Sequence, residues 1–208
     1  MKRCVIISAV EIDFPIEKMI RESDYVICAD KGWQNAVAHG IRPDLIIGDF
    51  DSSPRPERID ASVTVLPIEK DDTDTYYVSR YAIEHGFTDV LLRGVLGGKR
   101  IEHTIANIQT LLFFAENRVN ATAVDKYSQL MVVKDGNISI PDMPGKYFSV
   151  YSLTDKSEGV KIRGAKYPLD NYTMINSYPI GTSNEFIGER VDISVEKGSL
   201  LIVITSKD

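Results

Sequence analysis

Residues 41–53, with the sequence IRPDLIIGDFDSS, constrain the fold more than any other stretch of the chain. The apolar run over residues 45–47 is typical of a fully buried strand, and it stops at Gly48, before Asp49 and Asp51. If the backbone stays extended, both carboxylates point to one side, because side chains along a strand repeat with period two. Two converging carboxylates can hold a hard cation. The alternative interpretation is a turn with solvated aspartates.

The first part of the chain alternates short apolar runs with helical patterns. Strands are expected over residues 3–8, 25–29, 45–47, 63–67, 90–93 and 121–124, and helices over residues 32–39, 74–85 and 103–116. Gly40 and Gly86 follow the first two helices, where a left-handed residue is favoured. This alternation predicts a Rossmann-like α/β domain with a parallel sheet over residues 1–125.

The pattern changes after about residue 125 to short β-rich runs separated by turns, with no helical period of useful length. Asp135-Gly136 lies between two of these runs, residues 129–133 and 137–140, and predicts a hairpin. Further strands are expected over residues 147–153, 160–163, 192–195 and 199–205. The sequence therefore predicts a second, all-β sandwich domain over residues 126–208.

The composition favours a globular protein and argues against several classes of partner. At 208 residues with 43% hydrophobic side chains, the chain can bury a sizeable core. A net charge of -6 and a pI near 5.2 argue against nucleic-acid binding, so any bound phosphate must be met by metal ions or a few basic residues.

Cysteine usage and hydropathy bear on the cellular compartment. Cys4 and Cys28 each lie inside an apolar run, where they are expected to be small core residues in a reducing compartment. The apolar segment after the first residues is too short for a signal peptide, and no run is long enough to cross a membrane. We therefore expect a cytoplasmic protein with no membrane partner.

Polar residues follow four of the expected strands. Asp30 follows one strand, Asp49 and Asp51 follow the next, residues 70–74 (KDDTD) follow a third, and residues 94–103 follow a fourth. The carboxyl ends of parallel strands share one edge of the sheet, where ligands bind. Acids at three successive ends need a cation to neutralise them. Because the candidate ligands are hard oxygens and no Cys or His cluster has ligand spacing, Mg²⁺ is favoured over zinc.

Residues 94–100 (GVLGGKR) offer what phosphate groups need: flexible backbone N–H donors, together with the cations Lys99 and Arg100. The segment is not a P-loop, because Arg93 stands where that motif has glycine and Arg100 where it has serine or threonine.

Three polar residues at the expected helix starts have simpler interpretations as well. Thr73 and Asp74 open a helix, so N-capping is an alternative to ligation. His103 could likewise be only a residue of a first helical turn.

The motifs of this chain, taken in order, resemble those of the thiamine pyrophosphokinase family. They are residues 28–52 (CADKGWQNAVAHGIRPDLIIGDFDS), 69–74 (EKDDTD), 97–112 (GGKRIEHTIANIQTLL), 164–169 (GAKYPL) and 181–185 (GTSNE). The resemblance implies an α/β catalytic domain followed by a β-sandwich domain for thiamine binding and dimerisation, in a homodimer with active sites at the subunit interface. It implies Mg²⁺-dependent transfer of a pyrophosphoryl group from ATP to the hydroxyl of thiamine, giving thiamine diphosphate and AMP.

The resemblance also implies roles for individual residues. Asp49, Asp51 and Asp74 match the metal positions and, with Arg100, the catalytic ones. The matched positions for ATP are Asp30, Thr73, Arg100 and His103, and those for thiamine are Glu102, Ser183 and Asn184. Lys70 and Lys99 are expected at the ATP site as neighbouring cations. The chain departs from the family pattern at Lys31 and Trp33, at Lys99 where a glycine is usual, and at Glu102 where an aspartate is usual. No general base is assigned.

Two other functions are considered beside this one. A related pyrophosphokinase could act on another heterocyclic alcohol, such as a pterin, although the GTSNE segment and the β domain favour thiamine. A nucleotide-binding module without turnover would be favoured by loss of the acids, yet Asp30, Asp49, Asp51 and Asp74 are all present.

Overall fold

The computed structural model describes residues 2–51, 54–56, 59–69 and 71–207 and is a mixed α/β protein. Contacts within the chain divide it into two compact units, between Lys126 and Tyr127. Among the described residues, no helix combines the length and the apolar character needed to cross a membrane.

The first unit contains β1 (Arg3–Ile7), η1 (Glu17–Met19), β2 (Tyr25–Ala29), α1 (Gly32–Ala38), β3 (Leu45–Gly48), β4 (Ser62–Val65), α2 (Asp74–Glu84), β5 (Asp89–Arg93), α3 (Ile101–Glu116) and β6 (Asn120–Val124).

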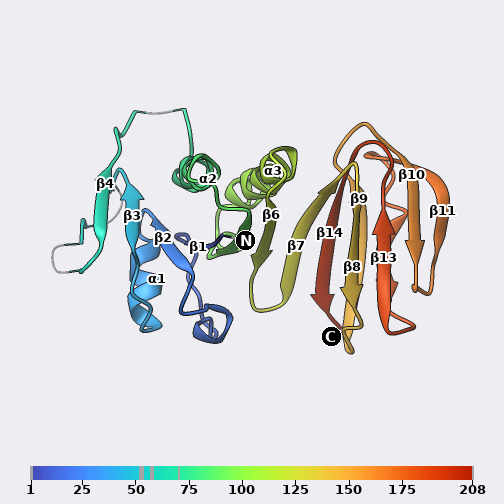
Figure 1. Cartoon of the computed structure of the whole chain (residues 1–208), viewed down its shortest axis with the longest axis horizontal. Helices are drawn as coiled ribbons and strands as arrows, with labels where there is room; N and C mark the ends of the chain where they lie inside the picture. The colour runs from blue at the N-terminus through green and yellow to red at the C-terminus, as the bar shows by residue number, and fades with distance from the viewer. Residues whose placement is uncertain (1, 52–53, 57–58, 70, 208) are drawn as a thin grey trace. The chain divides into compact units, whose positions relative to one another are not determined.

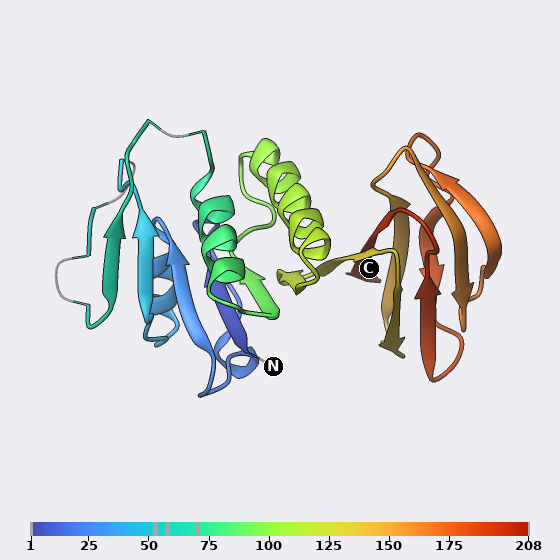
Figure 2. The same ribbon diagram turned by 45° about the horizontal axis from the view of Figure 1, so that its top comes forward.

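The first unit is built on six strands in the order β6-β5-β1-β2-β3-β4, and every neighbouring pair is parallel. Helices α2 and α3 lie on one face of this sheet and α1 on the other (Figures 1 and 2). The parallel sheet and its three helices agree with the sequence prediction. Strand order reverses between β1 and β5, and such a switch point is where open parallel sheets bind ligands.

The central strands of the first unit are apolar because both faces of the sheet are covered. Val5 and Ile7 of β1 pack with Val26 of β2 and Ala36 of α1 in one core cluster. Cys28 belongs to the same cluster. As predicted, Cys4 and Cys28 are free and fully buried, and burial raises the pKa of the Cys4 thiol to about 12.

Backbone hydrogen bonds continue between the chain segments at the carboxyl ends of β1 and β5. The Ser8 amide donates to the Arg93 carbonyl at 2.8 Å, and the Val10 amide donates to the Gly94 carbonyl at 2.9 Å. Gly94 has φ 65°, and a Cβ at this position would lie 2.5 Å from the Ser8 carbonyl oxygen. Only glycine satisfies both the left-handed backbone and the close approach.

We predict that Gly94→Ala destabilises the protein more than Gly86→Ala does. Gly86 has φ 74°, and a Cβ there would meet nothing within 4 Å, so both variants share the left-handed strain and differ only in available space. The expected additional loss is about 1–3 kcal/mol of unfolding free energy, the usual cost of overpacking. Urea denaturation measures it, and equal losses in the two variants would show that the close approach is relaxed at no cost.

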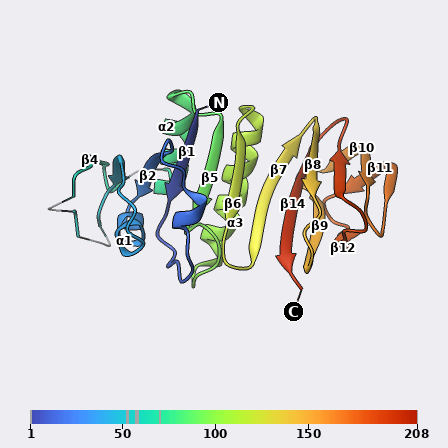
Figure 3. The same cartoon turned by 60° about the horizontal axis from the view of Figure 1, so that its bottom comes forward.

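The second unit consists of two antiparallel sheets, with strand orders β12-β9-β14-β7 and β11-β10-β13-β8 (Figure 3). Phe148 and Ile202 of the first sheet share one core cluster with Ile162 and Ile193 of the second, so the two sheets pack face to face. The strands are β7 (Ser128–Lys134), β8 (Asn137–Pro141), β9 (Lys146–Ser152), β10 (Lys156–Arg163), β11 (Leu169–Ile175), β12 (Gly181–Glu185), β13 (Arg190–Ser194) and β14 (Ser199–Ser206).

The hairpin predicted at Asp135-Gly136 is wrong. Strand β7 pairs with β14 and β8 pairs with β13, so the turn carries the chain from one sheet to the other. Asp135 does adopt a turn conformation, with φ 44°. Its backbone and carboxylate hydrogen-bond Gly198, at 3.0 and 2.8 Å, so the turn is tied to the connection between β13 and β14.

Candidate functional site

The loop after β2 is hydrogen-bonded to the end of β3 at the carboxyl edge of the parallel sheet. The Asp30 amide donates to the Ile47 carbonyl at 2.8 Å, and Asp30 is 8% exposed with φ 46°. Gly48 makes this contact possible, because a Cβ there would lie 2.7 Å from the Asp30 Cα. The backbone of Asp30 is thereby held beside the residue that precedes Asp49.

The backbone through Asp49 and Asp51 is a turn, the alternative interpretation of this stretch, and not the extended segment on which the converging carboxylates depended. Strand β3 ends at Gly48, Phe50 adopts φ 55°, and the Asp51 amide donates to Asp49 Oδ1 at 3.2 Å. The physical reason is Phe50, an apolar side chain that packs against the core of the unit and turns the chain. This turn sets the positions of the two carboxylates, with Asp49 half-buried and Asp51 exposed.

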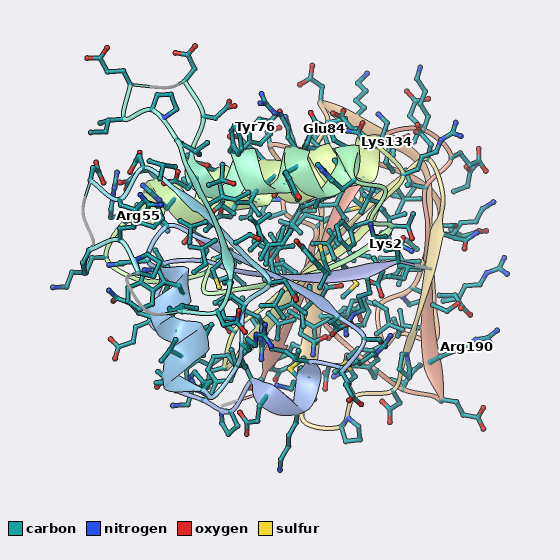
Figure 4. The ribbon with its side chains drawn as sticks, turned by 60° about the vertical axis from the view of Figure 1, so that its left-hand side comes forward. Lys2, Arg55, Tyr76, Glu84, Lys134 and Arg190 are labelled. Carbon is teal, nitrogen blue, oxygen red and sulfur yellow. The ribbon has the colours of Figure 1, made fainter. Side chains whose placement is uncertain are left out.

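The beginning of α2 supplies another acid of the predicted set. Thr73 is the N-cap and accepts a hydrogen bond from the Tyr76 amide at 3.2 Å, which confirms the capping interpretation of Thr73. Tyr76 marks the first turn and Glu84 the end of this helix in Figure 4. Asp74 is the first helical residue, where the positive end of the helix dipole stabilises a carboxylate.

A buried hydroxyl pair ties the start of α2 to the end of β1. Ser8 Oγ and Thr75 Oγ1 lie 2.7 Å apart, and both residues are buried. From α1, Asn35 Nδ2 donates to the carbonyls of Ser8 and Val10, each at 2.8 Å. Ser8, Asn35 and Thr75 were not predicted from the sequence as residues that shape the site. The available signal was that each is polar and adjoins a strand end or one of the singled-out motifs.

We predict that Thr75→Val lowers stability more than Thr75→Ser does. Valine matches the shape of threonine but leaves the buried Ser8 hydroxyl without this partner, which costs about 1–3 kcal/mol of unfolding free energy. Serine keeps the hydroxyl and removes only a methyl group. Chemical denaturation of both variants decides the point, and a smaller loss for valine than for serine would contradict it.

The loop after β5 is held in place at its base while its tip is exposed. Val95 and Leu96 are buried, and Asn107 of α3 donates from Nδ2 to the Val95 carbonyl at 2.6 Å. Gly97 and Gly98 have φ of 75° and 76°. Lys99 is exposed. The tip of the loop is thus open to a ligand.

Arg100 and Glu102 form an ion pair on the surface. Arg100 Nε and Glu102 Oε1 lie 2.7 Å apart, and the side chains are 68% and 61% exposed. The hydrogen bond from Arg100 lowers the pKa of Glu102. Water screens an ion pair that is this exposed, and the pair therefore adds little stability. Arg100 can consequently exchange this partner for a phosphate group. His103 lies half-buried in the first turn of α3, and its amide donates to the Arg100 carbonyl at 3.0 Å.

The candidate donors fit Mg²⁺ shared with a substrate and do not form a complete metal cage. No three His, Cys, Asp or Glu side chains in the described part of the chain gather closely enough to hold a metal by themselves. Asp30, Asp49, Asp51 and Asp74 offer only hard carboxylate oxygens. Mg²⁺ typically takes one or two carboxylates and completes its coordination with water and phosphates. Lys70, expected to contact ATP, lies outside the described residues.

Ser183 and Asn184 lie on β12 of the second unit. The pairing of β12 with β9 shifts between Gly181 and Asn184, and Ser183 within this bulge has φ 55°. Ser149 accommodates the bulge, because its Oγ accepts the Ser183 amide at 3.0 Å. The bulge leaves Ser183 exposed and Asn184 only 4% exposed, so the two residues have different surroundings.

Comparison with known proteins gives matches to both units. Residues 16–123 match the family model for the thiamin pyrophosphokinase catalytic domain, and residues 136–200 match that for its vitamin B1 binding domain. The chain is 31% identical to a thiamine pyrophosphokinase of Bacillus subtilis over 188 residues, covering 88% of this chain and 87% of the relative.

Two solved structures are similar over almost the whole chain. A thiamine pyrophosphokinase from Bacillus subtilis has a TM-score of 0.87 at 26% identity, with 100% of each chain covered. One from Geobacillus thermodenitrificans has a TM-score of 0.85 at 26% identity, with 99% of this chain and 98% of that chain covered.

Proposed function

The chain belongs to the thiamin pyrophosphokinase family, and we propose that it transfers a pyrophosphoryl group from ATP to the hydroxyl of thiamine, giving thiamine diphosphate and AMP. The observation that carries this proposal is the carboxyl edge of the parallel sheet, where Asp30, Asp49 and Asp51 follow two neighbouring strands. The match of residues 136–200 to a vitamin B1 binding domain favours thiamine over a pterin as the acceptor.

In the proposed reaction the hydroxyl oxygen of thiamine forms a bond to the β-phosphorus of ATP. The bond from that phosphorus to the oxygen bridging the α- and β-phosphates breaks, AMP leaves, and the hydroxyl proton is released. Asp49, Asp51 and Asp74 would hold Mg²⁺. When bound, the ion would neutralise charge on the phosphate oxygens. Positioning and electrostatics supply most of the rate enhancement in transfers of this kind, so no residue is assigned as a general base.

Other residues of the chain are proposed to bind the triphosphate and thiamine. The loop after β5 presents exposed backbone and Lys99 to phosphate oxygens, and Arg100 can make two parallel hydrogen bonds to them. Asp30, Lys70, Thr73 and His103 are proposed at the ATP site, and Glu102, Ser183 and Asn184 at the thiamine site.

The proposal is tested by incubating the purified protein with ATP, Mg²⁺ and thiamine and identifying the products by mass spectrometry. AMP and thiamine diphosphate should appear in equal amounts, and neither should form when a hydroxymethyl pterin replaces thiamine. Formation of ADP with thiamine monophosphate would contradict pyrophosphoryl transfer, and AMP formation only with the pterin would favour the alternative acceptor.

We predict that Asp49→Asn and Asp51→Asn each reduce kcat by at least about a hundredfold while the unfolding transition is retained, because a neutral amide of similar size is a poor Mg²⁺ ligand. Asp60→Asn is the matched control, since Asp60 is exposed and forms a surface ion pair with Arg42, at 2.6 Å. Near-normal rates for both variants at saturating Mg²⁺ would remove these two aspartates from the mechanism.

We further propose a homodimer in which Ser183 and Asn184 of one subunit complete the site whose metal is held by Asp49, Asp51 and Asp74 of the other. Mixing the inactive Asp51→Asn protein with the weakly thiamine-binding Asn184→Ala protein under subunit-exchange conditions, and assaying far below the KM for thiamine, should then restore about a quarter of the wild-type rate, well above the rate of either variant alone. The reason is that about half of randomly exchanged dimers are heterodimers, each with one undamaged site. Exchange confirmed by mass spectrometry without any return of activity would contradict the shared site.

A further inference from the structure

The side chain of Asn184 forms three hydrogen bonds with the protein's own backbone. Asn184 Oδ1 accepts the amides of Tyr167 at 3.0 Å and Glu185 at 2.9 Å, and Nδ2 donates to the Tyr167 carbonyl at 2.7 Å. A carboxamide oxygen has two lone pairs, and both are used. Since Asn184 is 4% exposed, its remaining N–H has little access to a ligand.

These bonds continue a short β ladder by means of a side chain. Ala165 bridges to Phe186, and the Lys166 amide donates to the Glu185 carbonyl at 3.0 Å. At the next position of the ladder, the Asn184 carboxamide takes the place of a peptide group and bonds both the N–H and the C=O of Tyr167. The backbone of Tyr167 is therefore fixed by Asn184.

The residue fixed in this way presents an aromatic ring to solvent. Tyr167 is 60% exposed. Large aromatic side chains contribute strongly to the free energy of folding or binding when they are buried. Lys166 Nζ lies 5.6 Å from the Tyr167 ring centroid and is paired with Glu185 at 2.6 Å. Glu185 also pairs with Lys207 at 2.7 Å, and the two lysines lower its pKa to about 2, so the carboxylate keeps its charge.

We propose that Asn184 acts on thiamine only through Tyr167: Asn184 is a positioning residue, and the ring of Tyr167 is the group that contacts the substrate. This inference rests on the proposed function. Thiamine carries an aminopyrimidine ring and a cationic thiazolium ring. An exposed tyrosine ring carried by a fixed backbone suits both, by stacking on the first or by a cation–π contact with the second. The paired charge of Lys166 removes most of the repulsion that a free ammonium would exert on the thiazolium.

The test is calorimetric titration of the full-length protein with thiamine, together with separate KM values for thiamine and ATP. Tyr167→Leu and Asn184→Ala should each weaken thiamine binding about tenfold with the KM for ATP unchanged, and Tyr167→Phe should bind like the wild type. Tyr178→Leu is the matched control, because Tyr178 is another tyrosine of the same unit, 54% exposed. In the double variant of Tyr167 and Asn184 the loss should not exceed that of the worse single change.

Two results would overturn the inference: unchanged thiamine affinity in Tyr167→Leu, or losses that multiply in the double variant. Hydrogen exchange of the Tyr167 amide tests the positioning role without any substrate. Exchange should accelerate in Asn184→Ala and stay unchanged in Ser183→Ala, and equal exchange in wild type and Asn184→Ala would also overturn it. A wild type that binds thiamine but forms no thiamine diphosphate would refute the proposed function alone, and loss of binding in Tyr167→Leu would still support the inference.

Discussion

The carboxyl edge of the parallel sheet depends on main-chain segments that touch with no side chain between them. Gly48 lets the loop after β2 rest on the end of β3, and Gly94 lets the loop after β5 rest on the segment after β1. Hydrogen bonds from Asn35 and the buried pair of Ser8 and Thr75 add α1 and α2 to the same contact. These contacts fix where the acidic residues and the glycine-rich loop begin. Any chemistry at this edge therefore depends on the packing of the backbone.

Apolar runs and helical periods were enough to predict the first unit, because a covered parallel sheet requires apolar strands. The same reasoning failed to predict strands whose buried positions are not occupied by apolar residues. Strand β12 was missed, since its buried positions are Gly181 and Asn184 and give no apolar alternation. Strand β11 was missed because Asn171, at φ 48°, lies where the pairing register with β10 shifts and breaks the period of two. The Asp135-Gly136 turn has hairpin chemistry, but the sheet that each strand joins is decided by distant partners.

Sequence placed the candidate acids at one edge through a topological rule, and the strands that precede them do end there. It could not give the turn between Asp49 and Asp51, because the packing of Phe50 is a tertiary effect. Nor could it separate Ser183 from Asn184, which share a motif but differ in exposure. That difference comes from a β-bulge, and it changes the interpretation of Asn184 from a ligand-binding side chain to one that shapes the backbone around Tyr167.

We propose that this edge gathers a divalent cation together with a triphosphate. Electron paramagnetic resonance of Mn²⁺, a stand-in for Mg²⁺, measures this directly with a nonhydrolysable ATP analogue present or absent. Because described side chains alone form no cluster of three acids, the protein should bind Mn²⁺ weakly by itself and much more tightly with the nucleotide. The gain should disappear in Asp49→Asn and Asp51→Asn. Equal Mn²⁺ affinity with and without nucleotide, or an unchanged gain in both variants, would contradict the account.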